Sequence, residues 1–533
     1  MIAQRETSVE ARREALQASI DATKSSADRN RLGQFATPNA LAIEIARYLN
    51  SLIGTRTRGV RFADPAIGTG SFFSAALTVF GQRRIKSAVG IELDTSFCNA
   101  ARDLWTENGL EVVCGDFTRV VASASCPPAP NLVLANPPYV RHHHLNRAQK
   151  DHLQRLTHKM TGVEVNGLSG LYVYFLLLAT AWMADSGHAA WLIPSEFMDV
   201  NYGTGIKRYL CDRVTLIRAH RFDPAEVQFG DALVSSVVIV LRKAPPPPQH
   251  AVEFSFGGTI AEPHACDRIS SQTLRDSRKW TVYPSHAQND RRVSCDDGGP
   301  RLAHLFRIQR GIATGSNGFF ILDRAEAKRR GLPSRYLRPI LPSPRHMRAT
   351  VIDADNVGYP LIDRQLCVID CDLPEHVLEE HYPALWEYLN TANLLGIRDG
   401  YLVGKRSPWY KQEQREPAPF LCTYMGRGTH EKQPFRFILN RSKAIGTNLY
   451  LMLYPQKALA TMLHKHPNRA ASIHELLGRV TGDELRGEGR VYGGGLHKIE
   501  PSELGRICAA SFIDRWPELG ESVRRIETPS LFS

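Results

Sequence analysis

The sequence predicts an α/β protein with a seven-stranded, mostly parallel sheet, followed by a second domain of mixed α+β structure. Two patterns predict this fold. Short apolar runs rich in β-branched residues alternate with helical stretches from Val60 onward, and a glycine-rich turn connects the first run to a helix. The expected strands lie near residues 60–63, 87–91, 111–113, 131–135, 188–193, 214–220 and 233–242.

The expected domain boundaries follow from composition. Residues 1–30 are rich in Ala, Arg, Glu and Ser, and they predict an exposed helical extension before an α/β domain of residues 31–243. Four consecutive prolines, Pro245–Pro248, can neither continue a strand nor enter a helix interior. Residues 244–250 are therefore expected to form a linker, and residues 251–533 to form the second domain.

The overall composition excludes several classes of protein. With 43% hydrophobic and 23% charged residues, the 533-residue chain has an ordinary globular composition. Its most apolar stretch, residues 168–183, is too short to span a membrane and predicts a buried helix. The charged amino terminus lacks the apolar core of a secretory signal, which favours a cytoplasmic protein. The ten cysteines include no CxxC pair, and the adjacent His142–His144 converge poorly on one ion, so we expect mostly free thiols and no metal site.

A glycine turn follows the first expected strand. Residues 60–77 read VRFADPAIGTGSFFSAAL, so a strand, a turn and a helix start follow one another. This arrangement lets a ligand approach the backbone closely at the carboxyl edge of an open sheet, although a tight structural turn is the alternative. No Gly-Lys-Ser/Thr follows, which excludes a P-loop, and Phe73 excludes a GxGxxG motif. The candidate ligand-binding residues are Asp64, Pro65, Ala66, Gly68 and Gly70.

Carboxylates follow the next two expected strands. Glu92, with Leu93 beside it, stands where an ionised carboxylate can accept both hydroxyl protons of a ribose, and a solvated acidic loop is the alternative. Asp116, after the third strand, can accept a hydrogen bond from an adenine amino group while Phe117 packs on the base.

The fourth expected strand delivers Asn136-Pro137-Pro138-Tyr139 to its carboxyl end. The two prolines stiffen this loop and remove backbone donors. The Asn136 side-chain oxygen and the Pro137 carbonyl are then fixed acceptors, and Tyr139 provides a flat aromatic wall. Two acceptors beside an aromatic face suit a planar group that carries an exocyclic amine.

Taken in order, the segments DPAIGTG (64–70), VGIELD (89–94), CGDF (114–117) and NPPY (136–139) resemble the motifs of class I S-adenosylmethionine-dependent amino-methyltransferases. They are similar in particular to the gamma subclass of N6-adenine DNA methyltransferases, of TaqI type. That subclass has an earlier cofactor motif, and Thr37 and Pro38 stand in its place here. These two residue types also suit a helix start, with Thr37 as the cap.

Two aromatic residues extend the resemblance. Phe175 lies on the expected helix that would pack near the cofactor adenine. Phe229, in a late and looser motif, would contact an extruded base from the side opposite Tyr139, and an aromatic of a hairpin turn that packs on the core is the alternative.

The resemblance implies a function. A class I Rossmann-like catalytic domain would use S-adenosyl-L-methionine to methylate the N6 amine of a flipped-out adenine in double-stranded DNA, and residues 251–533 would form a target-recognition domain. Such an enzyme would be a monomer in a bacterial or archaeal cytoplasm, and the modification arm of a restriction-modification system whose endonuclease acts separately. The alternatives are N4-cytosine methylation, methylation of RNA or of protein glutamine, and a non-catalytic DNA-binding homologue.

The charge of the chain suits a polyanionic partner. The formal net charge is +12, and basic residues cluster in the carboxy-terminal half. Solvated basic faces are the alternative, but phosphate contacts supply most of the sequence-independent affinity for DNA. The candidate DNA-binding residues lie in two basic patches: Arg324, Lys328, Arg329 and Arg330 in the first, Lys405 and Arg406 in the second.

Overall fold

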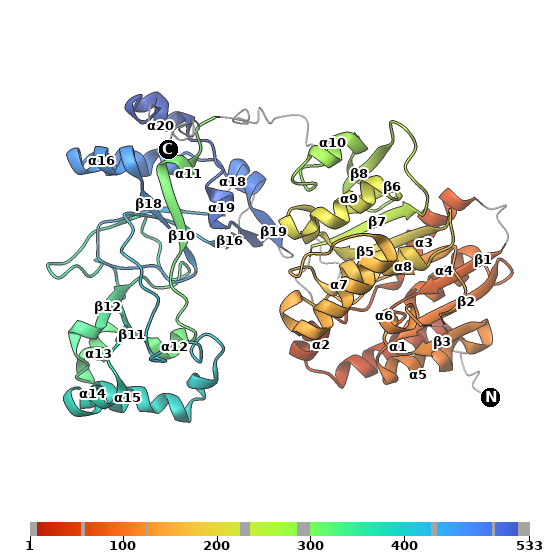
Figure 1. Cartoon of the computed structure of the whole chain (residues 1–533), viewed down its shortest axis with the longest axis horizontal. Helices are drawn as coiled ribbons and strands as arrows, with labels where there is room; N and C mark the ends of the chain where they lie inside the picture. The colour runs from red at the N-terminus through yellow and green to blue at the C-terminus, as the bar shows by residue number, and fades with distance from the viewer. Residues whose placement is uncertain are drawn as a thin grey trace, which may run out of the picture. The chain divides into compact units, whose positions relative to one another are not determined.

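A computed structural model describes residues 8–54, 59–123, 126–223, 235–284, 299–427, 434–492 and 496–520. The chain divides into two compact units. Unit 1 comprises Met1–Asp290 and Tyr492–Gly494, and unit 2 comprises Arg291–Val491 and Gly495–Ser533. Figure 1 colours the chain by residue number.

Unit 1 is built on a nine-stranded sheet with the order β3-β2-β1-β4-β5-β7-β6-β8-β9. The pairs among β1 to β5 are parallel, whereas β7 runs antiparallel to both β5 and β6. The strands are β1 (Val60–Asp64), β2 (Ile85–Glu92), β3 (Leu110–Cys114), β4 (Leu132–Ala135), β5 (His188–Pro194), β6 (Thr215–Arg221), β7 (Ser236–Arg242), β8 (Ala251–Gly258) and β9 (Pro263–Ser270).

All seven predicted strands are present, and the α/β fold class is confirmed. The expected strand count and the boundary at residues 244–250 are wrong. The chain passes the four prolines and then adds β8 parallel to β6, with β9 antiparallel beside β8. The prolines therefore form a connection within one sheet, and unit 1 extends well beyond them.

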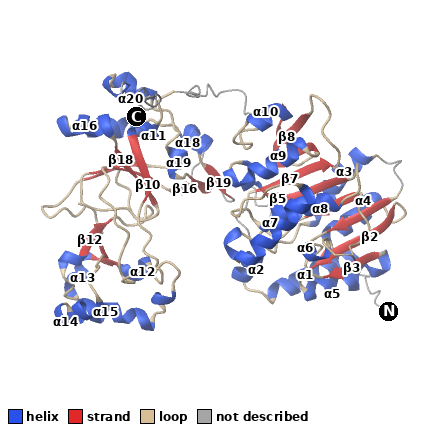
Figure 2. Cartoon of the chain, viewed as in Figure 1, coloured by secondary structure: helices blue, strands red, loops and turns tan. Residues whose placement is uncertain are grey.

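Helices cover both faces of the sheet, as Figure 2 shows. Buried side chains of α3, α4 and α5 pack on one face, and those of α6, α7, α8, α9 and α10 pack on the other. The helices of unit 1 are α1 (Val9–Ala22), α2 (Ser26–Leu32), α3 (Asn39–Ile53), α4 (Ser71–Phe80), α5 (Thr95–Trp105), α6 (Phe117–Val120), α7 (Arg147–Thr161), α8 (Leu171–Trp182), α9 (Thr204–Asp212) and α10 (Ser271–Asp276).

The apolar stretch at residues 168–183 forms α8, whose side chains are buried on nearly every side, so the prediction of a buried helix is confirmed. A helix that is apolar all round belongs in a core rather than at a surface. Within the described part of the chain, no helix has both the length and the apolar character that crossing a bilayer requires.

Unit 2 has the expected α+β composition. Its five-stranded sheet has the order β10-β18-β15-β17-β13, and two three-stranded sheets have the orders β11-β14-β12 and β16-β20-β19. The strands are β10 (Phe306–Arg310), β11 (Ile321–Asp323), β12 (Leu337–Ile340), β13 (Val351–Ile352), β14 (Leu366–Ile369), β15 (Phe420–Thr423), β16 (Met425–Arg427), β17 (Phe437–Asn440), β18 (Tyr450–Pro455), β19 (Arg490–Tyr492) and β20 (Leu496–Lys498).

Two hydrophobic clusters stabilise unit 2, one around β11, β12 and β14 and one between the large sheet and the last helices. The helices of unit 2 are α11 (Leu302–Leu305), α12 (Asn317–Phe320), α13 (Arg324–Arg329), α14 (Glu375–His381), α15 (Pro383–Leu394), α16 (Lys457–Lys465), α17 (Arg469–Gly478), α18 (Gly482–Glu488), α19 (Pro501–Leu504) and α20 (Ala510–Arg515).

The packing of α4 on the sheet generates a stability prediction. Phe73 is fully buried between Phe62 and Trp105, so Phe73→Ala should lower the free energy of unfolding by about 3–5 kcal/mol. Leu168→Ala, at a side chain that is 54% exposed, should change it by less than about 0.5 kcal/mol. Urea unfolding followed by tryptophan fluorescence measures both. Equal losses for the two variants would contradict the assigned core.

Candidate active site

The carboxyl ends of β1, β2, β3 and β4 meet at one edge of the sheet because these strands are parallel. The chain runs from β1 outward through β2 to β3 and then returns to the other side of β1 for β4. Open α/β sheets bind ligands in the crevice at such a reversal of strand order. Most of the predicted site residues of unit 1 lie at or near this edge, on the loops that follow β1 to β4.

The glycine loop between β1 and α4 is held by backbone hydrogen bonds to two carboxylates. The Ala66 N–H donates to Asp64 Oδ1 over 2.9 Å, and the Gly68 N–H donates to Glu92 Oε2 over 2.9 Å. Gly68 and Gly70 both have positive φ, which favours glycine. A Cβ at Gly70 would lie 2.4 Å from the Trp105 Nε1, whereas a Cβ at Gly68 would meet no atom within 4 Å. The loop is therefore closely packed at Gly70 and open at Gly68.

Two buried acids face this loop. Burial raises the pKa of Asp64 to about 8, and the nearby Glu92 charge adds to that effect. Burial also raises the pKa of Glu92, although the N–H groups of Asp94 and Gly68 oppose that shift. Two neighbouring acids whose protons are held this tightly form a favourable site for a cation, which stabilises their charged forms.

The residues beside these acids differ in exposure. The Leu93 side chain is 72% exposed directly after β2, which leaves it available to cover a flat ligand. Asp116 caps α6, because its Oδ1 accepts from the N–H and the hydroxyl of Thr118. Phe117 and Phe175 are both buried and lie 5.0 Å apart between ring centroids. The Phe117 ring packs inside the core, which differs from the expected open face for a base.

Asn136 follows β4, and its amide is fixed by two acceptors. Its Nδ2 donates to the Phe35 carbonyl over 2.8 Å and to the Thr37 hydroxyl over 3.1 Å. A carbonyl only accepts hydrogen bonds, so these contacts decide which end of the amide is nitrogen. The Asn136 Oδ1 is buried and accepts no hydrogen bond from the described residues. A buried, oriented acceptor without a donor is an opening for a ligand N–H.

Tyr139 anchors the same loop. Its N–H donates to the Gly33 carbonyl over 3.0 Å, its hydroxyl donates to the Leu192 carbonyl over 3.1 Å, and its ring centroid lies 5.6 Å from that of Phe35. The side chain is only 7% exposed, so the ring packs against protein instead of forming the expected open wall. Pro137 is buried and Pro138 is half-buried.

Thr37 and Pro38 occupy their predicted place, but the expectation that Thr37 caps the helix is wrong. Pro38 is the N-cap of α3, without a side-chain capping bond. The Thr37 hydroxyl instead accepts from Asn136, and the Thr37 carbonyl accepts from the Ser71 hydroxyl over 2.8 Å. Sequence reasoning missed Phe35, whose role rests on its carbonyl and so leaves no side-chain signal.

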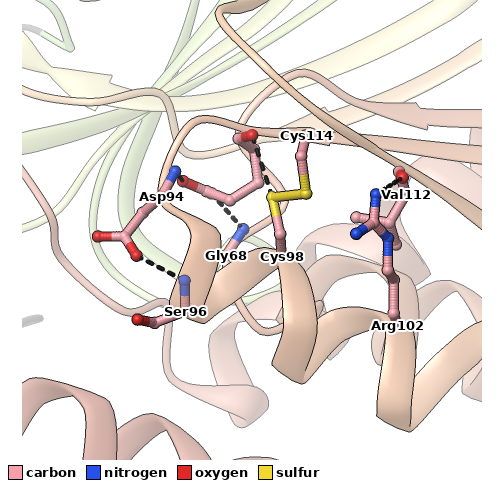
Figure 3. The surroundings of a disulfide bond; sticks show 8 residues. Gly68, Asp94, Ser96, Cys98, Arg102, Val112 and Cys114 are labelled. Carbon is pink, nitrogen blue, oxygen red and sulfur yellow. Dashed lines mark hydrogen bonds between the residues drawn. A yellow bond between two sulfur atoms is a disulfide. The ribbon is translucent and has the colours of Figure 1, made fainter.

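The expectation of mostly free thiols is wrong for one pair beside this edge. Cys98, in α5, and Cys114, at the end of β3, form a disulfide with their Cα atoms 5.9 Å apart, as Figure 3 shows. The pair meets because α5 connects β2 to β3 and returns along the sheet beside them. Six cysteines are free: Cys126, Cys211, Cys266, Cys367, Cys371 and Cys422.

Two further predictions concern this unit. Phe229 lies outside the described residues. His142–His144 form a single turn of 3-10 helix whose side chains are partly or fully exposed. In the described ranges, no group of three or more His, Cys, Asp or Glu is placed to hold a metal ion.

Most of the predicted DNA-binding residues of unit 2 already have protein partners. Arg324 pairs with Asp355 over 2.7 Å, and Arg329 and Arg330 both pair with Glu326. Lys405 donates to the Tyr401 hydroxyl over 2.6 Å. Lys328 is exposed. Arg406 points inward and donates to the carbonyls of Ala313 and Thr314, so its geometry is that of a structural residue.

Comparisons with known proteins agree with this edge as the site. Two family models match the chain: the Eco57I restriction-modification methylase at residues 131–228, and the C-terminal domain of the type II methyltransferase M.Eco57I at residues 277–527. The type II methyltransferase M.XamI of Xanthomonas campestris pv. amaranthicola is 26% identical over 87% of this chain and 83% of its own length. M.AccI of Acinetobacter calcoaceticus is 24% identical over 90% of this chain and 85% of its own length.

Solved structures show the same fold. The type IIL restriction-modification enzyme MmeI, solved in complex with DNA, aligns with a TM-score of 0.52 at 13% identity over 97% of this chain and 79% of that chain. The type IIG restriction endonuclease BpuSI aligns with a TM-score of 0.44 at 14% identity over 98% of this chain, which spans 63% of that longer chain.

The raised pKa of Asp64 generates a prediction about stability and pH. The folded protein holds the Asp64 proton up to a pH of about 8, whereas the unfolded chain releases it near pH 4. Between these values the folded state binds more protons, so this group's contribution to the free energy of unfolding is full at low pH and is lost as the pH rises to about 8. Asp64→Asn should remove that loss, so the variant gains stability relative to the parent between pH 5 and pH 8.

Urea unfolding of both proteins at several pH values measures the difference. A constant difference between the two proteins across this range would contradict the raised pKa. Asp116→Asn is the matched control, because its carboxyl is at the same sheet edge but partly exposed, and it should not reproduce the pH-dependent gain.

Proposed function

Because the chain belongs to the type II restriction-modification methylases, we propose that it transfers a methyl group from S-adenosyl-L-methionine to the N6 amine of an adenine in double-stranded DNA. The family makes it a DNA methyltransferase of a restriction-modification system. The base and the atom that it modifies are the finer part of this proposal.

The observation that carries the proposal is the buried, unsatisfied Oδ1 of Asn136. Its orientation is set before any substrate arrives, because Phe35 and Thr37 hold the amide nitrogen. An exocyclic amine has two N–H donors in the plane of the base. Asn136 Oδ1 would accept one of them, and the Pro137 carbonyl, on the stiff loop beside it, would accept the other.

The residues at the strand ends fit the cofactor. S-adenosylmethionine is cationic and carries a ribose and an adenine, and it supplies an electrophilic methyl group on its sulfonium. Asp64 would hold the amino group of its methionine part, and Glu92 would accept the ribose hydroxyls. The exposed Leu93 would cover one face of the adenine, Asp116 would accept from its amino group, and Gly68 leaves room for close approach.

These residues act by positioning and by polarising the amine. The lone pair of an amine attached to a purine is delocalised into the ring, which makes it a poor nucleophile. When Asn136 and Pro137 accept its two protons, the nitrogen can become pyramidal and direct its lone pair toward the methyl carbon. Positioning of this kind contributes about 7–11 kcal/mol in favourable cases, so a strong base is not required.

The amine is inside the stack of a duplex, so the base must be flipped out before reaction. We propose that Phe229 packs on the extruded base and that Tyr139 keeps the acceptor loop rigid behind it. Unit 2 would recognise the target sequence, with Lys328 and the exposed arginines near it on the phosphates. The enzyme would act as a monomer, beside a separate restriction endonuclease.

The product identifies the target base. Incubation with S-adenosylmethionine and unmethylated genomic DNA, digestion to nucleosides and mass spectrometry should yield N6-methyladenosine in its deoxy form. N4-methyldeoxycytidine would keep the acceptor chemistry and replace the target base, since the same two oxygens fit a cytosine amine. Cofactor binding without any methylated nucleoside would contradict DNA as the substrate and leave RNA or protein glutamine.

Asn136→Ala tests the acceptor. Removing one preorganised hydrogen-bonding group from a reacting centre typically lowers kcat by about 10²–10³-fold, and we expect at least this loss here. The Kd for S-adenosylmethionine, measured by calorimetry, should stay within about threefold because the acids that hold the cofactor are untouched. Asn99→Ala, at an exposed position of α5, is the control and should retain full turnover. Normal turnover in Asn136→Ala would contradict the proposed role.

A further inference from the structure

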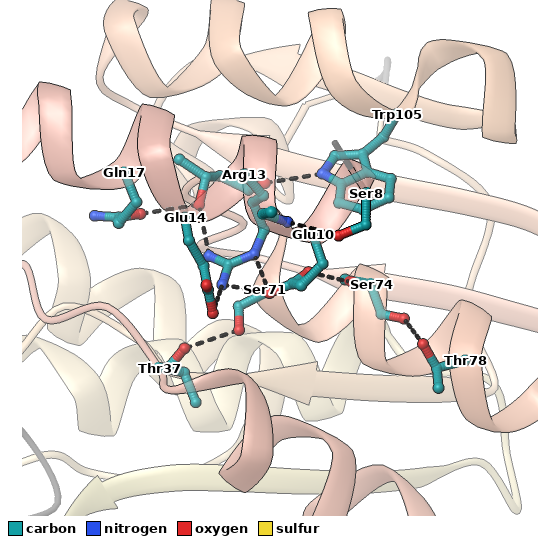
Figure 4. A network of polar contacts seen from close by, with 12 residues as sticks. Ser8, Glu10, Arg13, Glu14, Gln17, Thr37, Ser71, Ser74, Thr78 and Trp105 are labelled. Carbon is teal, nitrogen blue, oxygen red and sulfur yellow. Dashed lines mark hydrogen bonds and ion pairs between the residues drawn. The ribbon is translucent and has the colours of Figure 1, made fainter. Parts of the chain in front are cut away.

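The amino-terminal helix α1 makes an unusual contact for an exposed helix. Most of its side chains face solvent, yet Arg13 is only 3% exposed. A buried guanidinium is costly unless it is fully paired. Figure 4 shows where Arg13 goes: its Nη1 donates to the Thr69 hydroxyl over 3.1 Å. Thr69 lies in the glycine loop, between Gly68 and Gly70.

The contact is reinforced on both sides. Glu10 accepts from Arg13 Nε over 2.8 Å and from Nη2 over 2.6 Å, and it also accepts from the Ser74 hydroxyl in α4. On the loop side, the Thr69 hydroxyl donates to Gln17 Oε1 over 2.9 Å. Helix α1 therefore grips the single residue between the two glycines and the helix that follows the loop.

A second contact lies farther along the same segment. Lys24 pairs with Asp94, which follows β2, and donates to the Gln34 side chain over 2.9 Å. The Asp94 N–H in turn donates to Glu92 Oε1 over 2.9 Å. Residues 8–34 thus contact the glycine loop, the loop after β2 and the approach to Thr37.

The glycine loop needs such support. Glycine has the greatest backbone freedom of any residue, and the loop has one on each side of Thr69, both with positive φ. Three contacts from outside the loop restrict it: Gly68 N–H to Glu92, the Thr69 carbonyl to the Trp105 Nε1 over 2.8 Å, and the Thr69 hydroxyl to α1. Only the last of these comes from the amino-terminal segment.

We propose that α1 is part of the cofactor-binding machinery, with Arg13 and Thr69 as positioning residues that hold the glycine loop in its ligand-binding conformation. This inference rests on the proposed function, which places the cofactor at that loop. Neither side chain needs to touch the cofactor. Because energetic coupling between two events is reciprocal, a cofactor that favours the ordered loop also strengthens the docking of α1.

The first test compares cofactor binding in matched variants by calorimetry and steady-state kinetics. Arg13→Gln should raise the Kd and KM for S-adenosylmethionine about 10-fold or more, the loss expected for one charge-assisted hydrogen bond, while kcat at saturating cofactor stays within about twofold. Arg12→Gln, at the exposed neighbouring position, should leave all three constants unchanged.

A conservative pair separates positioning from simple destabilisation. Thr69→Ser keeps the hydroxyl and should bind the cofactor within about twofold of the parent, whereas Thr69→Val keeps the volume and should bind about 10-fold more weakly. Equal cofactor affinity in Arg13→Gln, Thr69→Val and the parent would overturn the inference and leave the proposed function standing. A parent protein that binds no S-adenosylmethionine would overturn both.

Hydrogen exchange of the α1 amides provides a readout independent of activity. In the parent, saturating S-adenosylmethionine should slow exchange across residues 12–22, and in Thr69→Val at saturation this added protection should be reduced. Equal exchange in the parent with and without cofactor would overturn the coupling.

Discussion

The two hydrogen bonds donated by the Asn136 amide are the constraint on which the rest of the site depends. They tie the loop after β4 to the Phe35 carbonyl and the Thr37 hydroxyl, about 100 residues earlier in the chain. The Tyr139 N–H strengthens the same connection at Gly33. A Cβ at Gly33 would lie 2.3 Å from the Tyr139 nitrogen, so a glycine is needed for the two segments to approach this closely. The free acceptor is therefore placed by two segments that have no local connection.

The electrostatics of the site follow from the same crowding of strand ends. Asp64 and Glu92 are brought together because β1 and β2 are adjacent and parallel, and burial raises the pKa of both carboxyls. Such an arrangement lowers stability without a ligand near neutral pH. A cationic ligand reverses that cost, since it favours the charged form of each acid. The site is thus less stable than an ordinary core in the place where a cation is to bind.

Sequence patterns predicted the sheet well because parallel strands are buried on both faces, which makes every strand a near-continuous apolar run. They failed at residues 244–250 because four prolines indicate a local break but not which strand pairs next, and β8 returns to β6 in the same sheet. The free-thiol prediction failed at Cys98 and Cys114 for a related reason, because their contact depends on how α5 packs.

The candidate site was predicted in position more accurately than in detail. Strand ends placed Asp64, Glu92 and Asn136 correctly at one edge, since that placement follows from topology alone. The aromatic residues were harder, because a Phe or Tyr after a strand has the same pattern whether it faces a ligand or the core. Phe117 and Tyr139 are buried. Arg13 gave no signal at all, because a lone arginine in a polar helix is usually solvated.

Unit 2 shows that a count of basic residues overestimates the charge available to DNA. Within the described residues 324–338, Arg324, Arg329, Arg330 and Arg338 each form an ion pair with a nearby acid. The Arg324 guanidinium also lies 3.9 Å from the centre of the Tyr359 ring, which holds it in one orientation. A phosphate would have to compete with these partners, and exposed ion pairs are weak enough for such an exchange. The buried Arg338–Asp370 pair, whose carboxylate is 7% exposed, resists it and serves the fold. Sequence-independent affinity for DNA would therefore come from the exposed pairs of α13, and the arginines inside unit 2 would position the surface that carries them.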